Sequence, residues 1–208
     1  MKGPRPDRGA GFSLHPGRPA DARACAALMR AAVRAVSRTL LPREARAAWS
    51  SLPPLYHRWA MGPGGERYLL ARRGGRALGF AAWRGEELTA LFVRPRAQRR
   101  GVGRALVRAV ALAARREGRR RLRVQAARGA VPFYRSVGFL RLGPSRVPLP
   151  GGPALAVERM RMELLAAPAR HPVRRAGAQW MGSVEVTSAR YRSTTRSRPS
   201  RHEASSPR

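Results

Sequence analysis

The sequence predicts an α/β domain, and three patterns along the chain carry this prediction. Two segments, Cys25 to Val36 and Gly101 to Arg116, repeat apolar residues at steps of three and four, the period of one buried helical face. Between them lie short runs rich in aromatic and aliphatic residues, joined through glycines as in β-hairpins. In the second half of the chain, strand-like and helix-like segments alternate, which favours an α/β arrangement over a helical bundle.

The length of 208 residues gives room for one domain with a single hydrophobic core and an extension. We expect residues 1–11 to form a flexible leader, residues 12–165 the folded domain, and residues 166–208 a basic, disordered tail. The tail carries nine arginines against two acids without sustained periodicity. No apolar stretch reaches the roughly 18 residues that a membrane-spanning helix needs, and the N-terminus lacks a signal-peptide pattern. We therefore expect a cytoplasmic protein without membrane contact.

Capping and turn residues predict the elements of the first half. Phe12–His15 is the first predicted strand, and Asp21 stands where the next helix needs an N-cap for its unpaired amides. Pro42 opens a second predicted helix that runs to Trp49, because the Pro53–Pro54 pair prevents its continuation. The apolar positions of the first helix are Cys25, Leu28, Met29, Ala32, Val33 and Val36.

Strands dominate the middle of the chain. Gly74 and Gly75 separate two strand-like runs, Tyr68–Ala71 and Ala77–Trp83, and predict a tight hairpin turn because glycine adopts positive φ at little cost. The remaining predicted elements are strands at 86–93, 122–125 and 157–164 and helices at 101–116 and 130–137.

The net charge of +32 has two open explanations. Lys2 is the single lysine, and abundant Arg, Ala, Gly and Pro are typical of a GC-rich coding sequence whatever the function. Alternatively, the charge reflects an anionic partner such as nucleic acid. Cys25 lies on the buried helical face and has no disulfide partner, and the four histidines show no zinc-site spacing. We therefore expect no metal.

The most informative stretch is a strand, a short loop and a glycine turn that opens an Arg-rich helix. It runs from Glu87 to Gly103. The N-terminus of a helix offers unpaired amides and a partial positive charge, which together hold a phosphate group. The turn lacks the Gly-Lys-Ser/Thr of a Walker loop and the third glycine of a dinucleotide-binding turn. A glycine pair before a helix is weak by itself, since glycine marks many turns.

Two linked motifs resemble the signatures of the Gcn5-related N-acetyltransferase (GNAT) family. Gln98, Gly101 and Gly103 match the acetyl-CoA signature, and the strand ending at Pro95 resembles the family's preceding strand. About thirty residues after the turn, Ala130–Phe139 is similar to the second signature, a helix that carries Phe-Tyr and closes on Gly-Phe. The resemblance extends from about residue 12 to 164.

This resemblance implies a mixed, mostly antiparallel, twisted sheet of six to seven strands flanked by about four helices. It also implies acetyl-CoA as donor, with the pantetheine arm beside one strand and the pyrophosphate on the glycine turn. The residues implied in binding it are Leu91, Phe92, Val93, Gln98, Arg99, Arg100, Gly101, Val102, Gly103 and Arg104. Many relatives have Asn where Gly129 stands here, so we expect somewhat weaker binding.

Two residues are candidates for catalysis. The resemblance places Tyr134 near the sulfur, where its hydroxyl protonates the leaving thiolate; the alternative is an aromatic anchor for the helix. Glu87 lies six residues before Val93, where histone-modifying members carry their general base. Its alternative is a hairpin acid paired with an arginine, and the neighbouring Glu86 competes for the assignment.

The predicted activity is transfer of an acetyl group to a primary amine of a small molecule or protein, by direct attack in a ternary complex. Two alternatives stay open: an acetyltransferase acting on aminoacyl-tRNA, and a non-catalytic, basic nucleic-acid-binding protein that keeps the fold. A homodimer is an open alternative to a monomer. The acceptor slot is barely specified: Trp49, Tyr56, His57, Trp59 and Trp83 form either an aromatic roof over it or part of the core.

Overall fold

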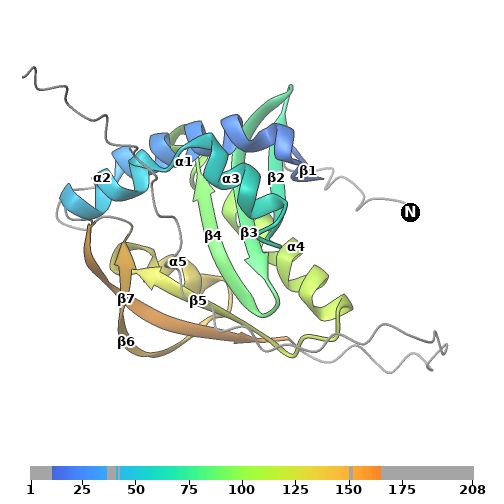
Figure 1. Ribbon diagram of the computed structural model, residues 1–208. Coiled ribbons are helices and arrows are strands. Elements are labelled where there is room, and N and C mark those ends of the chain that lie inside the picture. The colour runs from blue at the N-terminus through green and yellow to red at the C-terminus, as the bar shows by residue number, and fades with distance from the viewer. Residues whose placement is uncertain (1–10, 37–40, 42, 150–151, 165–208) are drawn as a thin grey trace, which may run out of the picture. The chain divides into compact units, whose positions relative to one another are not determined.

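The computed structural model describes residues 11–36, 41, 43–149 and 152–164, which form one seven-stranded sheet with helices on both faces (Figure 1). The predicted tail and nearly all of the predicted leader lie outside these ranges. The strand order is β1-β2-β3-β4-β5-β7-β6. The strands are β1 Ser13–Pro16, β2 Arg67–Arg73, β3 Arg76–Arg84, β4 Glu87–Val93, β5 Arg121–Ala127, β6 Leu140–Leu149 and β7 Gly152–Glu163.

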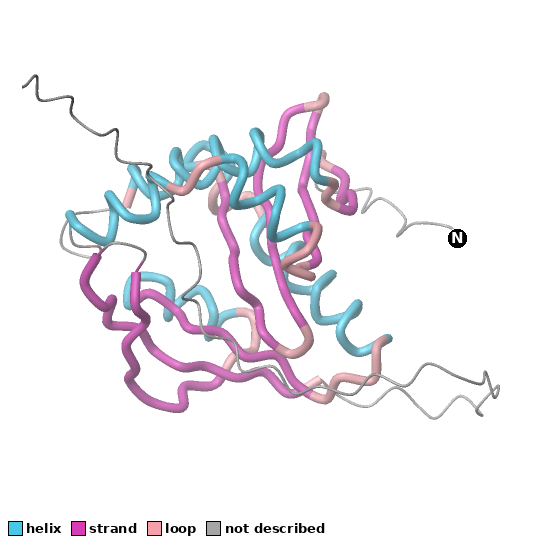
Figure 2. The backbone as a smooth tube through the Cα atoms, viewed as in Figure 1, coloured by secondary structure: helices cyan, strands magenta, loops and turns pink. Residues whose placement is uncertain are grey.

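The sheet is mixed and mostly antiparallel, as the sequence predicts. Strands β1 to β4 form an antiparallel meander, and β5, β7 and β6 form a second antiparallel group. Gly74 and Gly75 make the β2–β3 turn with φ of 53° and 76°, the positive angles that a tight hairpin requires. The two groups meet at β4 and β5, which run parallel. Figure 2 shows the strands of both groups in magenta and the helices in cyan.

Five α-helices cover the two faces of the sheet within the described residues. One face carries the first three helices and the other carries the last two, as the two clusters of buried side chains show. None of these helices is long and apolar enough to cross a membrane. The helices are α1 Ala22–Ala35, α2 Arg43–Ser51, α3 Pro54–Met61, α4 Val102–Arg116 and α5 Val131–Ser136.

Helix α4 packs closely on the sheet at its first turn. Val102 and Leu106 are buried, and their side chains face Gly79 of β3. A Cβ atom at Gly79 would lie 3.0 Å from the carbonyl oxygen of Phe92, 3.1 Å from Val102 and 3.2 Å from Leu106. A larger residue at this position would therefore push the start of α4 or the Phe92 backbone away by a few tenths of an ångström.

Several local predictions need correction. Asp21 stands at the N-cap position of α1, but its carboxylate accepts hydrogen bonds from the Arg18 amide and the Arg72 guanidinium instead of the helix amides. The Pro53–Pro54 pair ends α2 but also starts α3, because proline is well suited to the first position of a helix. Strand β6 was not predicted.

Candidate functional site

The loop that connects β4 to α4 is held in place by hydrogen bonds to the sheet. The Arg94 amide donates to the carbonyl of Leu78 at 2.8 Å, and Arg94 Nε donates to the carbonyl of Ala77 at 2.7 Å. Gln98 Nε2 donates to the Val93 carbonyl at 3.3 Å. This hydrogen bond closes the loop onto the end of β4, so the Gln98 side chain stabilises the turn.

The glycine turn has the backbone that an anion site needs. Gly101 has φ of 79°, and Arg99 also has a positive φ, 57°, so the chain reverses sharply before the helix begins. A Cβ atom at Gly101 would meet nothing within 4 Å, so open space lies in front of the turn. The first amides of α4, from Val102 onward, have no preceding helical carbonyl to bind. Together these features fit a diphosphate group.

The basic side chains around this turn are exposed. Arg99, Arg100 and Arg104 all lie on the solvent side of the loop and helix. Within the described residues, none of the three forms an ion pair. Their charges therefore add to the positive end of the α4 dipole.

The two sequence motifs meet in space at Gly103. A Cβ atom there would lie 3.2 Å and 3.3 Å from ring atoms of Phe133 and 3.7 Å from Val93. Phe133 belongs to α5, which carries the second motif, and Val93 ends β4. The glycine thus admits the Phe133 ring against the first turn of α4 and joins the second motif to the first.

Strands β4 and β5 are paired only near the start of β4 in the described part of the chain. Their pairing has one register position, Glu87 opposite Arg123, within the described residues. Beyond Glu87, the β5-facing edge of β4 therefore has no strand partner, and this edge includes Leu91, Phe92 and Val93. Unpaired backbone groups on a strand edge bind an extended chain, which suits the amide groups of a pantetheine arm.

Glu86 lies just before β4, at the point where β4 and β5 are still paired. Its carboxylate accepts hydrogen bonds from Arg121 at 2.9 Å and Arg123 at 2.8 Å, and its carbonyl accepts the Arg123 amide at 2.7 Å. The hydrogen bond from Arg123 comes first among the causes that hold the pKa of Glu86 below its ordinary value. Glu86 is thus the paired hairpin acid, and it is removed as a rival to Glu87 for a catalytic role.

Glu87, the predicted base, begins β4 opposite Arg84 of β3 and is half-buried. Among the described residues it forms no ion pair.

Tyr134, the predicted acid, is 7% exposed and packs edge-on against Phe133 and Phe139. Burial raises the pKa of Tyr134, so its hydroxyl keeps its proton at neutral pH and is available to donate it.

The candidate aromatic roof is divided by the structure. Trp49 packs edge-on against Phe92, with 6.3 Å between the ring centroids, and Tyr56 packs on the buried His57. These four residues lie on the sheet face that carries α1 to α3. Trp83 is buried on the other face, in the cluster that includes α4. Trp59 of α3 is 54% exposed. Trp83 is therefore a core residue and cannot form a roof with the others.

Sequence reasoning missed one acidic residue at this end of the sheet. Glu66 is half-buried just before β2, and the hydroxyl of Thr89 on β4 donates to its Oε2 at 3.0 Å. Burial is the main cause that raises the pKa of Glu66. Its sequence context, a lone acid after Gly64 and Gly65, gives no motif.

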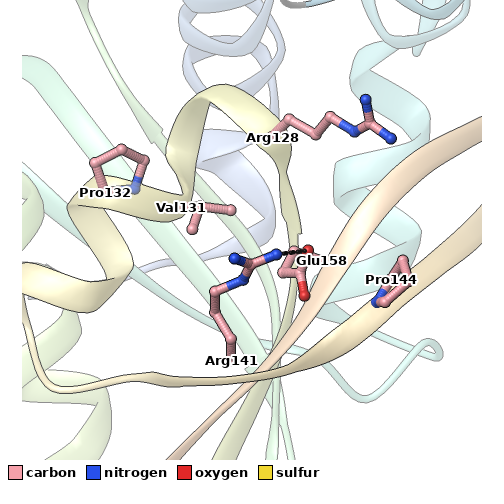
Figure 3. A pocket seen from close by; sticks show the side chains of 6 residues that line it. All are labelled: Arg128, Val131, Pro132, Arg141, Pro144 and Glu158. Atoms are coloured by element: carbon pink, nitrogen blue, oxygen red, sulfur yellow. Dashed lines mark hydrogen bonds and ion pairs between the residues drawn. The ribbon is translucent and has the colours of Figure 1, made fainter.

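A separate hollow of about 420 Å³ lies between the start of α5 and the β6–β7 pair (Figure 3). Glu158 is almost buried there, and its carboxylate accepts a hydrogen bond from Arg141 at 2.9 Å. This bond is the first of the causes that lower the pKa of Glu158. Since Arg141 lies on β6 and Glu158 on β7, the pair ties the edge strand β6 to its neighbour. The lining residues are Arg128, Val131, Pro132, Arg141, Pro144 and Glu158.

The chain also matches a known protein family. The family model described as "Acetyltransferase (GNAT) domain" matches residues 46–148, a range that includes β4, the glycine turn and Tyr134. The chain belongs to the GNAT acetyltransferase family. The comparison with curated proteins gives no match.

Three solved structures illustrate the fold. A Gcn5-related N-acetyltransferase of Rhodopseudomonas palustris is 28% identical, with a TM-score of 0.67 over 73% of this chain and 95% of that one. A putative acetyltransferase of Salmonella typhimurium, solved with its cofactor acetyl-CoA, is 20% identical, with a TM-score of 0.56 over 77% and 98%. A phosphinothricin acetyltransferase of Sinorhizobium meliloti, in complex with acetyl-CoA, is 19% identical, with a TM-score of 0.56 over 74% and 89%.

Proposed function

We propose that the protein transfers an acetyl group from acetyl-CoA to a primary amine of a small molecule or a protein. The observation that carries the proposal is the open glycine turn at Gly101, placed directly after a strand whose edge has lost its partner. A diphosphate needs the first feature and an extended amide chain needs the second. Coenzyme A contains both groups in this order.

Different residues bind the pyrophosphate and the pantetheine arm of acetyl-CoA. The amides of Val102, Gly103 and Arg104 hold the pyrophosphate, with Gly101 keeping the space in front of them open. Leu91, Phe92 and Val93 offer backbone groups to the pantetheine arm. The Salmonella and Sinorhizobium proteins, which share the fold, were solved with acetyl-CoA, and this supports acetyl-CoA as the donor. Acetyl-CoA, when bound, supplies an acetyl group activated as a thioester.

The acceptor amine must lose a proton before it attacks. For an amine with a pKa near 10.4, deprotonation at pH 7 costs about 4 to 5 kcal/mol, so a nearby carboxylate is an advantage. Glu87, which begins β4, is half-buried and free of ion pairs with other described residues, so it is one candidate for this role. When the bond between the acetyl carbon and the sulfur breaks, the Tyr134 hydroxyl donates its proton to the departing thiolate.

Release of free thiol from acetyl-CoA tests this proposal. Spermidine, a lysine-containing peptide and a peptide with a free N-terminus serve as acceptors, and mass spectrometry identifies the acetylated product. We expect amine-dependent thiol release with one class of acceptor. A protein that binds acetyl-CoA but acetylates none of these amines contradicts the proposal. Heparin is added as a polyanion control, since so basic a protein holds phosphates without specificity.

A further inference from the structure

A polar cluster beside β4 has no part in the donor site described above. It is centred on Glu66 and Thr89, whose side chains are joined by the 3.0 Å hydrogen bond between Thr89 Oγ1 and Glu66 Oε2. Thr89 occupies a bulge: Leu88 pairs with Trp83 and Ala90 with Ala82, which leaves Thr89 as the extra residue of β4. Bulges of this kind redirect a side chain, and here the redirected side chain holds a carboxylate.

The position of Thr89 along β4 places this carboxylate near the acyl end of the proposed donor site. The glycine turn follows the C-terminal end of β4, so a pantetheine arm runs backward along the strand from Val93. Thr89 precedes Val93 by four residues, which corresponds to roughly 13 Å along an extended strand. Glu66 is fixed there through its backbone, since its amide donates to the carbonyl of Ala60 in α3 at 2.8 Å.

The partner of Glu66 is unusual for this protein. The chain has 43 basic residues against 11 acids, and most of the described acids are paired with arginine. Glu66 instead binds a hydroxyl, and within the described residues it forms no ion pair. A purely structural acid in such a chain has many arginines available to neutralise it. The paired acids are Asp21, Glu86, Glu117, Glu158 and Glu163.

The groups around Glu66 adjust its proton affinity in opposite directions. Burial raises its pKa most, the Thr89 hydroxyl and the Arg84 charge lower it, and the negative charge of Glu87 raises it. The Arg84 guanidinium is partly engaged elsewhere, donating to the Gly64 carbonyl at 3.1 Å. Tyr56 on α3 and Tyr68 on β2 also lie close enough for the Glu66 charge to raise their pKa values.

We propose that Glu66, rather than Glu87, takes the proton from the acceptor amine. The ammonium nitrogen gives its proton to the Glu66 carboxylate and keeps the electron pair; Glu66 becomes a neutral acid and returns the proton to solvent. The two carboxylates, Glu66 and Glu87, together select a cationic primary amine. The inference rests on the proposed function, since it assigns a residue to that reaction.

The test compares Glu66→Gln, Glu87→Gln and the control Glu163→Gln, which changes an exposed acid on β7. With an amine that the natural protein acetylates, we expect Glu66→Gln to lower kcat by about 100-fold or more, within the range of general-base catalysis, while acetyl-CoA affinity is unchanged. Glu163→Gln retains the natural rate. A Glu66→Gln rate within threefold of the natural one overturns the inference, as does a loss confined to Glu87→Gln. If the natural protein acetylates no amine, the proposed function itself fails.

Two substitutions at Thr89 separate a catalytic role from a structural one. Thr89→Val removes the hydrogen bond that stabilises the charged carboxylate, so the acidic limb of the pH–rate profile moves to higher pH; Thr89→Ser keeps the hydroxyl and the natural profile. Glutamate-labelled 13C NMR of the protein without donor gives a second readout. The carboxyl signal that Glu66→Gln removes titrates above the usual glutamate range and moves up in Thr89→Val. An ordinary titration of that signal, unaffected by Thr89→Val, contradicts the inference.

Discussion

Acid should destabilise the fold through one buried histidine. His57 is 1% exposed and packs against Tyr68 and Phe80, with Nδ1 3.1 Å from the Tyr68 hydroxyl. Its Nε2 is buried and has no hydrogen-bond partner among the residues that the structure describes. Burial is the main cause that lowers the pKa of His57 from 6.5 to about 4, and the Arg30 charge adds to it. The folded protein therefore binds fewer protons at this site than the unfolded chain does.

The sign and size of the effect follow from that difference. A pKa depressed in the folded state gives stability that is fully present above pH 6.5 and is lost as pH falls toward 4. Each tenfold change in proton affinity corresponds to about 1.4 kcal/mol, so the His57 contribution at pH 4.5 is lower than at pH 7.5 by about 2.5 kcal/mol. Other groups also titrate in this window, but their contributions cancel when a variant is compared with the natural protein.

Urea unfolding at pH 7.5 and pH 4.5 measures this contribution. We expect His57→Phe to lose about 2.5 kcal/mol less than the natural protein between the two pH values, whatever its stability at pH 7.5. The comparison uses the difference between pH values because a phenyl ring in this packed site changes the baseline. Equal losses in the two proteins would show that the His57 imidazole does not stay neutral in the fold and would refute the reasoning.

Two further predictions concern the packing of α4 and the role of Tyr134. Gly79→Ala places a methyl group 3.0 Å from the Phe92 carbonyl oxygen and 3.1 Å from Val102, so we expect the free energy of unfolding to fall by about 1–3 kcal/mol in urea titrations; an unchanged value contradicts the close approach of α4 to β3. Tyr134→Phe keeps the packing against Phe133 and Phe139 but removes the hydroxyl, so we expect slower turnover with unchanged acetyl-CoA affinity by calorimetry. An unaltered rate leaves Tyr134 with a packing role alone.

The sequence was sufficient for elements whose signals are local. The period of α4 and the glycines at 74, 75 and 101 predict a helix, a hairpin and a turn, and the structure confirms all three. The sequence does not reveal helix α3, because a proline pair fits both the end of one helix and the start of the next. Strand β6 was missed because Gly143 and Pro144 interrupt its pattern, and an edge strand tolerates such residues.

The roles of the acidic residues at the candidate site cannot be predicted from the sequence, because they depend on tertiary structure. Glu86 and Glu87 are neighbours in the sequence, and only the approach of β5 reveals that Glu86 is neutralised by Arg121 and Arg123. Glu66 and Thr89 are 23 residues apart, and a bulge brings them together. No periodicity or motif contains this information. The glycine turn, in contrast, is a local backbone shape, and its glycines mark it in the sequence.

Acetyl-CoA affinity of two matched glycine variants tests the central claim most directly. Gly101 and Gly118 flank the two ends of α4, with φ of 79° and 78° and open space at both Cβ positions. Glu at either position brings the same strain and the same charge, but only Glu at 101 meets the proposed phosphate. By isothermal calorimetry we expect Gly101→Glu to abolish binding and Gly118→Glu to retain it. Unchanged affinity in Gly101→Glu, or equal loss in both variants, would contradict the placement of the donor at this turn.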